Sequence, residues 1–361
     1  MKAISLFSGC GGMDLGFVQA GFEIAYANDI DKEAGRTYLR NFGMALDRRS
    51  ILDVKPEEIP DADVVIGGPP CQSWSVAGAL RGEDDPRGKL FFEYIRLLEA
   101  KQPKAFIAEN VPGIAMPRNS AAFRKILKLM SGAGYNVAWK ILDARDFCLA
   151  QERKRVIVAG IRKDIGSGYS YPGPLCTKEG STIDGIATKK WKGIREALAG
   201  LPEAVPALEK NKPNPNVLFP NHEYMVGSFS TIYMSRNRRR GWDSQSFTIQ
   251  AGGRHAPLYP GSCAMEKVSQ NKWVFTGNEY RRLTVREAAR IQTFPDDFIF
   301  IYKSLADGYK MVGNAVPVKL AYAVAKKIAE DFAAAPDQIH KIAKRRKGKA
   351  IIDNAVLYSK P

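Results

Sequence analysis

The first half of the chain alternates short apolar runs with segments of helical periodicity. Each apolar run ends in glycine or polar residues, and the intervening segments place apolar residues three or four positions apart. This pattern is typical of an α/β protein with a largely parallel sheet. It predicts strands at residues 3–7, 24–29, 63–68, 105–110, 136–142 and 155–161, and helices at 15–20, 31–41, 89–100 and 121–130.

After residue 162 the pattern changes. Gly, Pro, Asn and Ser become dense and no regular period persists, which indicates a loop-rich module containing some strands. Helical periodicity returns at residues 284–292 and 318–332, and the chain ends in a basic stretch, HKIAKRRKGK. The second half is therefore expected to have a different function from the sheet.

Charge adds a candidate partner. The 361 residues include 54 Lys and Arg against 38 Asp and Glu, a formal net charge of +16. An excess of this size points to a polyanion, most commonly nucleic acid. A basic enzyme without such a partner is the alternative.

Cysteine and histidine usage narrows the chemistry. The five cysteines form no CxxC pair, and only three histidines are present. We therefore expect no zinc site or other metal, no disulfide framework, and a reducing compartment. The N-terminal apolar run is too short for a signal peptide and no run approaches a membrane span, so we expect a cytoplasmic protein without membrane contact.

Several functional groups follow the predicted strands. The first strand ends in the glycine-rich FSGCGG (7–12), the second in Asp29, the third in GGPPCQSW with Cys71, and the fourth in Glu109. Ligands bind outside the carboxyl ends of parallel strands, so these groups are expected to share one site.

The glycine loop and Asp29 favour a nucleoside-bearing cofactor, with the carboxylate on ribose hydroxyls. A dinucleotide fingerprint would need a third glycine where Asp14 stands, and no Lys-Ser/Thr pair of a phosphate loop is present. S-adenosylmethionine is therefore favoured over NAD. A tight turn that only packs strand on helix is the structural alternative.

Cys71 is the candidate nucleophile. Two prolines brace it, and a thiolate is strongly nucleophilic. The basic QERKR (151–155) would raise its thiolate fraction. A thiol protease would need a histidine partner, and His222, His255 and His340 lie outside the predicted sheet edge; a packed structural cysteine is the remaining alternative.

Six motifs in one order resemble those of C5-cytosine-specific DNA methyltransferases: FSGCGG, GGPPCQSWS, ENVPG, QERKR, RRLTVREAARIQTFPDDF and GNAVPVKLA. The resemblance runs from residue 2 to about 328. It is most similar to the GGCC-specific modification methyltransferases of type II restriction–modification systems, on the segments FPNHEY, GSFSTIYMSRNR and GALRGEDDPRGKLFFEYIR.

The resemblance implies an α/β, Rossmann-like sheet with helices on both faces and an inserted target-recognition domain. The catalytic, S-adenosylmethionine-binding domain would comprise residues 1–168 and 310–335, the recognition domain 169–309, and a basic tail 336–361.

The implied reaction transfers a methyl group to cytosine C5. Cys71 would add to C6 and make C5 nucleophilic, and Glu109 would contact N3 and the exocyclic amine. Arg155 would hold O2, and Arg153 would support the same site electrostatically. The resemblance places the cofactor against Phe7, Ser8, Gly9, Cys10, Gly11, Gly12, Asp29, Ile30, Asp53, Val54, Pro70, Leu90 and Asn314.

The implied substrate is double-stranded DNA, from which the target base must be flipped. Residues 73–89 have the composition of a lid. The expected target is GGCC, methylated at the inner cytosine, by a monomer whose functional partner is a cognate restriction endonuclease. Expected DNA contacts, to bases or phosphates, are Ser73, Arg81, Arg87, Arg236, Arg238, Arg239, Arg240 and Arg254.

Cys148 stands where the family usually has glycine, and we expect it to be a small packed residue. Two alternatives remain: a transfer-RNA cytosine methyltransferase, and a non-catalytic DNA-binding relic of the fold. The long stretch between residues 162 and 283 argues against the first, and intact Cys71, Glu109 and Arg155 against the second.

Overall fold

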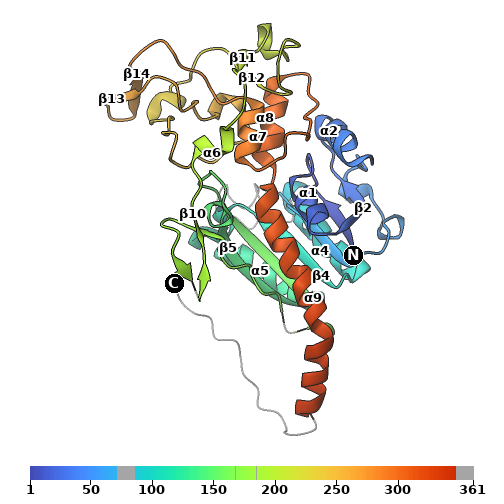
Figure 1. Ribbon diagram of the computed structural model, residues 1–361. Helices are drawn as coiled ribbons and strands as arrows, with labels where there is room; N and C mark the ends of the chain where they lie inside the picture. The colour runs from blue at the N-terminus through green and yellow to red at the C-terminus, as the bar shows by residue number, and fades with distance from the viewer. Residues whose placement is uncertain (71–85, 167, 184, 347–361) are drawn as a thin grey trace.

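The computed structural model describes residues 1–70, 86–166, 168–183 and 185–346 (Figure 1). Its centre is a six-stranded sheet in the order β2-β1-β3-β4-β6-β5. Within this sheet β6 alone runs opposite to the other five strands, which confirms the mostly parallel arrangement. Its strands are β1 (Lys2–Leu6), β2 (Glu23–Asn28), β3 (Val64–Gly67), β4 (Ala105–Asn110), β5 (Tyr135–Asp143) and β6 (Lys154–Arg162).

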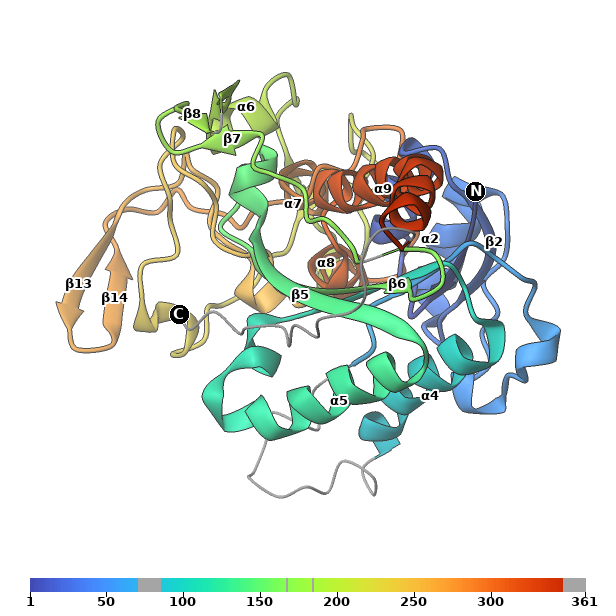
Figure 2. The same cartoon turned by 90° about the horizontal axis from the view of Figure 1, so that it is seen from below.

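Helices cover both faces of this sheet (Figure 2). Val64 and Ile66 of β3 belong to the core that includes α1 and α9, whereas Val65 belongs to the core that includes α4 and α5. Alternate strand residues thus supply both faces, as the continuous apolar runs require. The covering helices are α1 (Gly12–Gln19), α2 (Lys32–Phe42), α4 (Pro86–Lys101), α5 (Ser120–Gly132) and α9 (Val318–Arg346).

Helix α9 is longer than its sequence pattern predicts. It begins at Val318, as expected, but continues to Arg346, into the stretch expected to be a tail. Its N-terminal half packs on α1, where a side chain at Gly16 would lie 2.5 Å from Ala321. Neither α9 nor any other helix in the described part of the chain is long and apolar enough to cross a membrane.

The region after β6 contains short elements joined by long loops (Figure 1, top and left). Phe294, Phe298 and Phe300 pack with α7 and α8 in its core. The expected helix at 284–292 is confirmed as α7, whereas α8 and the β13–β14 hairpin were not predicted. The elements are α6 (Ile194–Leu198), α7 (Val285–Ile291), α8 (Leu305–Asn314), β7 (Cys176–Thr177), β8 (Thr182–Ile183), β9 (Ile186–Ala187), β10 (Lys189–Lys190), β11 (Val205–Pro206), β12 (Glu223–Tyr224), β13 (Met265–Ser269) and β14 (Lys272–Phe275).

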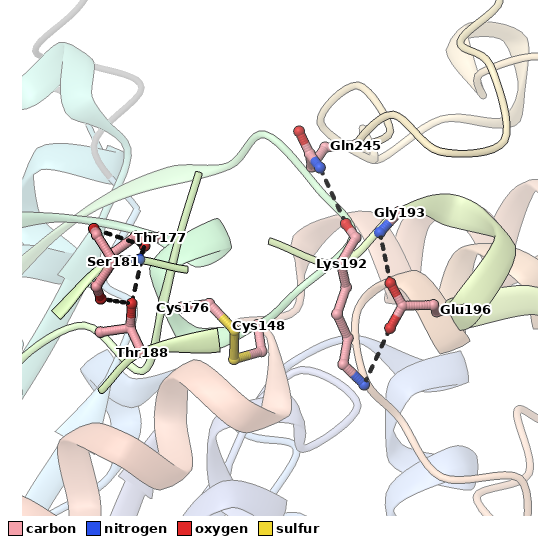
Figure 3. The surroundings of a disulfide bond; sticks show 9 residues. All are labelled: Cys148, Cys176, Thr177, Ser181, Thr188, Lys192, Gly193, Glu196 and Gln245. Carbon is pink, nitrogen blue, oxygen red and sulfur yellow. Dashed lines mark hydrogen bonds and ion pairs between the residues drawn. A yellow bond between two sulfur atoms is a disulfide. The ribbon is translucent and has the colours of Figure 1, made fainter. Parts of the chain in front are cut away.

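A disulfide joins the two regions, and the expectation of none was wrong (Figure 3). Cys148 ends the 3₁₀ turn Ala144–Phe147 with φ +62°, and bonds to Cys176 in β7, 28 residues later. The amide of Leu175 donates to the carbonyl of Asp146 at 2.7 Å, which brings β7 against this turn. A single long-range pair leaves no spacing signature, so the cysteine pattern could not reveal it.

Candidate active site and recognition surface

A cavity of about 720 Å³ lies at the carboxyl ends of β1 to β4. Phe7, Asp29, Pro70 and Glu109, one from the end of each strand, all line it. The end of α8 and the segment before α9 also line it, through Lys310, Met311, Gly313, Asn314, Ala315 and Val316. The four strand ends therefore meet at one site, as parallel order predicts.

The loop between β1 and α1 uses conformations that favour glycine. Gly9 and Gly11 have φ of +55° and +89°, in the left-handed region. A side chain at Gly11 would lie 2.3 Å from Phe42 of α2, and one at Gly12 would lie 2.5 Å from the Val316 carbonyl. Gly11 thus permits packing on α2, and Gly12 lets the segment before α9 approach the loop.

Asp29 fixes this loop and offers acceptors to a ligand. Its two carboxylate oxygens accept hydrogen bonds from the amides of Gly9 and Asp31, both at 2.8 Å. Burial raises its pKa, against the lowering effect of these two bonds. Each carboxylate oxygen has a second lone pair, so hydroxyl groups can still be bound.

Asp14 is a buried carboxylate beneath the same loop, and the sequence reading assigned it no role. It accepts from the Ser5 hydroxyl at 2.8 Å and from the Tyr38 hydroxyl at 2.6 Å. Burial raises its pKa to about 6. The Ser8 hydroxyl donates to Ser5 Oγ at 2.8 Å, so a chain of hydrogen bonds joins Asp14 to the loop.

Glu109 and Arg155 form an ion pair at the cavity wall. Arg155 Nε lies 2.6 Å from Glu109 Oε1, and each side chain is only 11% exposed. The residues come from β4 and β6, which are adjacent antiparallel strands. Glu109 Oε2 faces Gly68, where an added Cβ would lie 3.4 Å away. The carboxylate is therefore close to the segment that leads into Cys71.

The residues before Cys71 are held by a side chain that the sequence reading overlooked. Asn110 Nδ2 donates to the carbonyl of Pro69 at 3.0 Å. This bond ties the proline pair after β3 to the end of β4, and Pro70 lines the cavity. Cys71 itself lies outside the described residues.

Arg153 is buried in the protein, with 1% of its surface exposed. Its guanidinium donates to the carbonyls of Ile249, Gly313 and Ala315, each at 2.9 Å. Burial, reinforced by Arg155, lowers its pKa despite the nearby Glu109. The Arg153 guanidinium thus already donates three hydrogen bonds to backbone carbonyls of the protein.

The structure brings most of the expected cofactor residues together at the cavity. Three residues that were expected to contact the cofactor are not among the described residues that line the cavity: Gly11, Asp53 and Val54. Ile51 and Leu52, which precede Asp53 in the chain, do line it. Lys310, paired with Asp31 at 2.6 Å, is a further lining residue that sequence reasoning missed. The expected residues that line the cavity are Phe7, Ser8, Gly9, Cys10, Gly12, Asp29, Ile30, Pro70, Leu90 and Asn314, together with Glu109, Arg153 and Arg155.

Comparison with known proteins identifies the family. The model of the C-5 cytosine-specific DNA methylase family matches residues 1–330. The chain belongs to this family. It is 51% identical over 336 residues to the type II methyltransferase M.MthTI of Methanothermobacter thermautotrophicus, covering 92% of this chain and 98% of that protein. It is 50% identical to M.FnuDI of Fusobacterium nucleatum, covering 91% and 94%.

A solved structure shares the fold. It is described as a DNA modification methyltransferase encoded within a prophage (E. coli), and it superposes with a TM-score of 0.66 at 23% identity, covering 92% of this chain and 99% of that one. The protein is thus a C5-cytosine DNA methyltransferase with the α/β fold of its family. In the described part of this methyltransferase, no group of three or more His, Cys, Asp or Glu is arranged to hold a metal ion.

The arginines expected to bind DNA differ in accessibility. Arg236 and Arg254 are exposed. Arg239 donates to the carbonyl of Pro260 at 3.0 Å and is half-buried. Ser73, Arg81 and the Arg87 side chain lie outside the described part of the methyltransferase. The remaining two arginines, Arg238 and Arg240, make polar contacts with other residues of the protein.

Arg238 is buried, and its Nε and Nη2 donate to the carbonyls of Tyr233 and Ile232 at 3.0 and 3.2 Å. Arg240 pairs with Glu152 at 3.1 Å and stacks over Phe247 at 4.2 Å. Arg238 supports the local chain, and only 6% of its surface is exposed. Arg240 joins the module to QERKR, since Glu152 belongs to that motif.

Proposed function

We propose that this methyltransferase transfers a methyl group from S-adenosylmethionine to C5 of a cytosine flipped out of double-stranded DNA. The observation that carries the proposal is the Glu109–Arg155 pair, which faces the cavity beside the proline pair that precedes Cys71. Addition of a thiolate to a pyrimidine ring is assisted by a carboxyl group and a cation beside the ring, and we expect Cys71, the residue after Pro70, to supply the thiolate.

The residues at the cavity fit S-adenosylmethionine. Asp29 has acceptors for ribose hydroxyls, and Ile30, which is 66% exposed, offers an apolar surface to an adenine ring. Phe7, Leu52 and Leu90 line the same cavity. When bound, the cofactor supplies an electrophilic methyl group and leaves as S-adenosylhomocysteine.

The chain's own residues would perform the remaining steps. The Cys71 thiolate forms a bond to C6, and the ring electron pair moves toward C5. Glu109 donates a hydrogen bond or proton at N3, where negative charge develops, and Arg155 holds O2. After C5 is methylated, a base removes the C5 proton, and the returning electron pair breaks the bond between Cys71 Sγ and C6. Residues 73–89, expected as a lid, lie largely outside the described residues.

We place DNA recognition in the loop-rich region, with residues 1–168 and 310–335 forming the catalytic domain. The boundary at 309/310 falls inside α8, so we move it to the end of that helix, Asn314. Proposed DNA contacts are the exposed Arg236 and Arg254, the half-buried Arg239 and Arg240, and Ser73, Arg81 and Arg87; Arg238 is left out because it is buried.

The proposed target is GGCC, methylated at the inner cytosine. Its support is the resemblance of FPNHEY, GSFSTIYMSRNR and the lid segment to GGCC-specific enzymes. The type II names of M.MthTI and M.FnuDI support a role in a restriction–modification system, with a cognate endonuclease as functional partner. We further propose that the enzyme acts as a cytoplasmic monomer.

A mechanism-based adduct tests this function. The protein is incubated with S-adenosylmethionine and a duplex carrying 5-fluorocytosine at the inner position of GGCC, which cannot lose a C5 proton. A denaturant-stable protein–DNA adduct is expected, and Cys71→Ala should abolish it. An adduct with other duplexes but not with GGCC would disprove the target. An adduct with a transfer RNA alone would replace DNA as substrate, and no adduct at all would disprove the mechanism.

A further inference from the structure

Three polar side chains are buried where β6 begins against the loop-rich region. Gln151, Arg153 and Gln292 have exposed fractions of 0%, 1% and 0%. They come from the QERKR motif and from the residue that ends α7. We call these three side chains the polar junction. Burial of such groups is costly unless their donors and acceptors are satisfied, so their partners are informative.

The two glutamines form a chain across the interface. Gln151 Nε2 donates to Gln292 Oε1 at 2.9 Å, and Gln151 Oε1 accepts from the Ile249 amide at 2.9 Å. Gln292 Nε2 donates to the carbonyls of Val312 and Ala315, at 2.7 and 3.3 Å. The chain therefore reaches from the loop-rich region to the segment that lines the cavity.

Arg153 links the same two segments. Its three carbonyl partners are Ile249 on one side and Gly313 and Ala315 on the other. The backbones themselves touch here, because a Cβ at Gly313 would lie 2.2 Å from the carbonyl group of Gln250. Residues 249–250 and 313–315 are thus held together by both packing and hydrogen bonds.

The junction also fixes the strand that carries Arg155. Segment 246–250 runs beside QERKR: Ser246 N donates to the Ala150 carbonyl at 2.8 Å, and Glu152 N donates to the Ser246 carbonyl at 2.9 Å. Side chains alternate along this extended stretch, so Gln151, Arg153 and Arg155 share one side. A shift of segment 246–250 would therefore be felt at both the cavity wall and the Glu109–Arg155 pair.

We propose that the polar junction is a positioning device that couples the loop-rich region to the reacting centre. The inference rests on the proposed function, because it assigns target recognition to that region. We class the three side chains of the polar junction as positioning residues because their hydrogen bonds are made to other residues of the protein. They set the placement of Arg155 and of the 313–315 backbone when DNA is held, so their loss lowers the methyl-transfer rate more than DNA affinity.

The test uses Gln151→Met, Gln292→Met and the double variant in the full chain. Methionine matches glutamine in length without the amide. Single-turnover methylation of a GGCC duplex is measured with DNA and S-adenosylmethionine saturating, and active sites are counted by the 5-fluorocytosine adduct. We expect each single variant to lose about 10-fold or more in rate per active site, with the DNA Kd within about 3-fold of wild type.

Non-additivity is the second readout. Since the two glutamines act through one chain of hydrogen bonds, the double variant should be within about 2-fold of the slower single variant. If the fold-loss in rate of the double variant equals the product of the losses of the two single variants, the coupling is overturned. If a methionine variant does not fold, Gln151→Asn and Gln292→Asn, which keep the amide but shorten its reach, provide the same comparison.

Tyr302→Phe is the matched control. It removes another buried hydrogen bond of the loop-rich region, from the Tyr302 hydroxyl to Glu223 Oε1 at 2.9 Å, outside the junction. It should lower Tm and leave the rate per active site unchanged. Junction variants that behave like this control would show a purely structural role and overturn the inference. Wild-type protein that methylates no DNA would instead disprove the proposed function.

Discussion

Asp14 in the sheet region and Arg282 in the loop-rich region are two buried charged groups that are satisfied in different ways. In the sheet region, the Asp14 carboxylate is satisfied by the hydroxyls of Ser5 and Tyr38. In the loop-rich region, the buried Arg282 stacks over Phe229 at 3.9 Å and donates to two backbone carbonyls. Long loops leave carbonyls without ladder partners, and a guanidinium provides five donors for them. Part of this region's positive charge is therefore structural, at the buried Arg238, Arg282 and Arg286, and only the exposed part is available to DNA.

The largest expected effect is at the Glu109–Arg155 pair, which lines the cavity. Glu109→Gln and Arg155→Met should each lower kcat by about 100- to 10,000-fold, because charge developing on the ring loses its stabilisation. Methyl incorporation into a GGCC duplex, expressed per folded active site, measures the loss, and Tm reports separately the cost of leaving one member of the pair without its partner. Lys154→Ala, at an exposed neighbour, is the control and should stay near wild type. Comparable losses in the control would remove the case for a specific pair.

Arg282→Met tests the structural role of buried arginine. It leaves the carbonyls of Gly227 and Ser228 without their donor and removes the contact with Phe229, so it should destabilise by about 3–4 kcal/mol. Urea unfolding measures this change, and the rate per active site should be retained. A variant as stable as wild type would show that guanidinium donors do not hold these loops.

Breaking the disulfide between the two regions should cost about 3.5 kcal/mol, since it closes a 28-residue separation in the unfolded chain. Dithiothreitol or Cys148→Ala should have the same effect on urea unfolding, and dithiothreitol should not destabilise the variant further. Alanine, like cysteine, is a non-glycine residue at φ +62°, so the backbone strain at this position is the same in the variant and the wild type. Cys263→Ala, at a free cysteine, is the control. An equal loss of stability in Cys263→Ala would show that the loss does not come from breaking the disulfide.

The buried carboxylate of the sheet region should make stability depend on pH. Its pKa is about 6 in the folded protein against an ordinary 3.8, so the folded state binds a proton that the unfolded chain has already lost. This stabilisation, at most about 3 kcal/mol, is complete below about pH 4 and is lost as pH rises through 6. Asp14→Asn should flatten the unfolding profile over this range. Asp61→Asn, at a 90% exposed side chain, should keep it.

The smallest effect is expected at the exposed arginine of the loop-rich region. Arg254→Ala should leave Tm unchanged and reduce the salt slope of DNA binding by about 1, as for loss of one phosphate contact. Titrations of a GGCC and a scrambled duplex at several salt concentrations measure it. A loss confined to GGCC would instead assign Arg254 to a base edge, and an unchanged slope would remove it from the DNA surface.

The site could be predicted to very different degrees in the two regions. Asp29, Pro70 and Glu109 were found because each follows a strand whose apolar run is visible in sequence. Asn110 was missed because its importance lies in a bond to Pro69, 41 residues earlier. Gln292 was missed because a glutamine at a helix end carries no signal of its partners on other segments.

What the sequence by itself determined is the sheet, the order of its motifs and the family. Local periodicity and contiguous motifs depend on neighbours in the chain, so they survive without coordinates. Only the tertiary structure decided the Cys148–Cys176 bond, the burial of Arg153 and Arg238, and the polar junction. Each of these depends on contacts between distant segments or on the folding of a loop. Whether burying a polar side chain stabilises the protein is decided by the hydrogen-bond partners that such contacts bring to it.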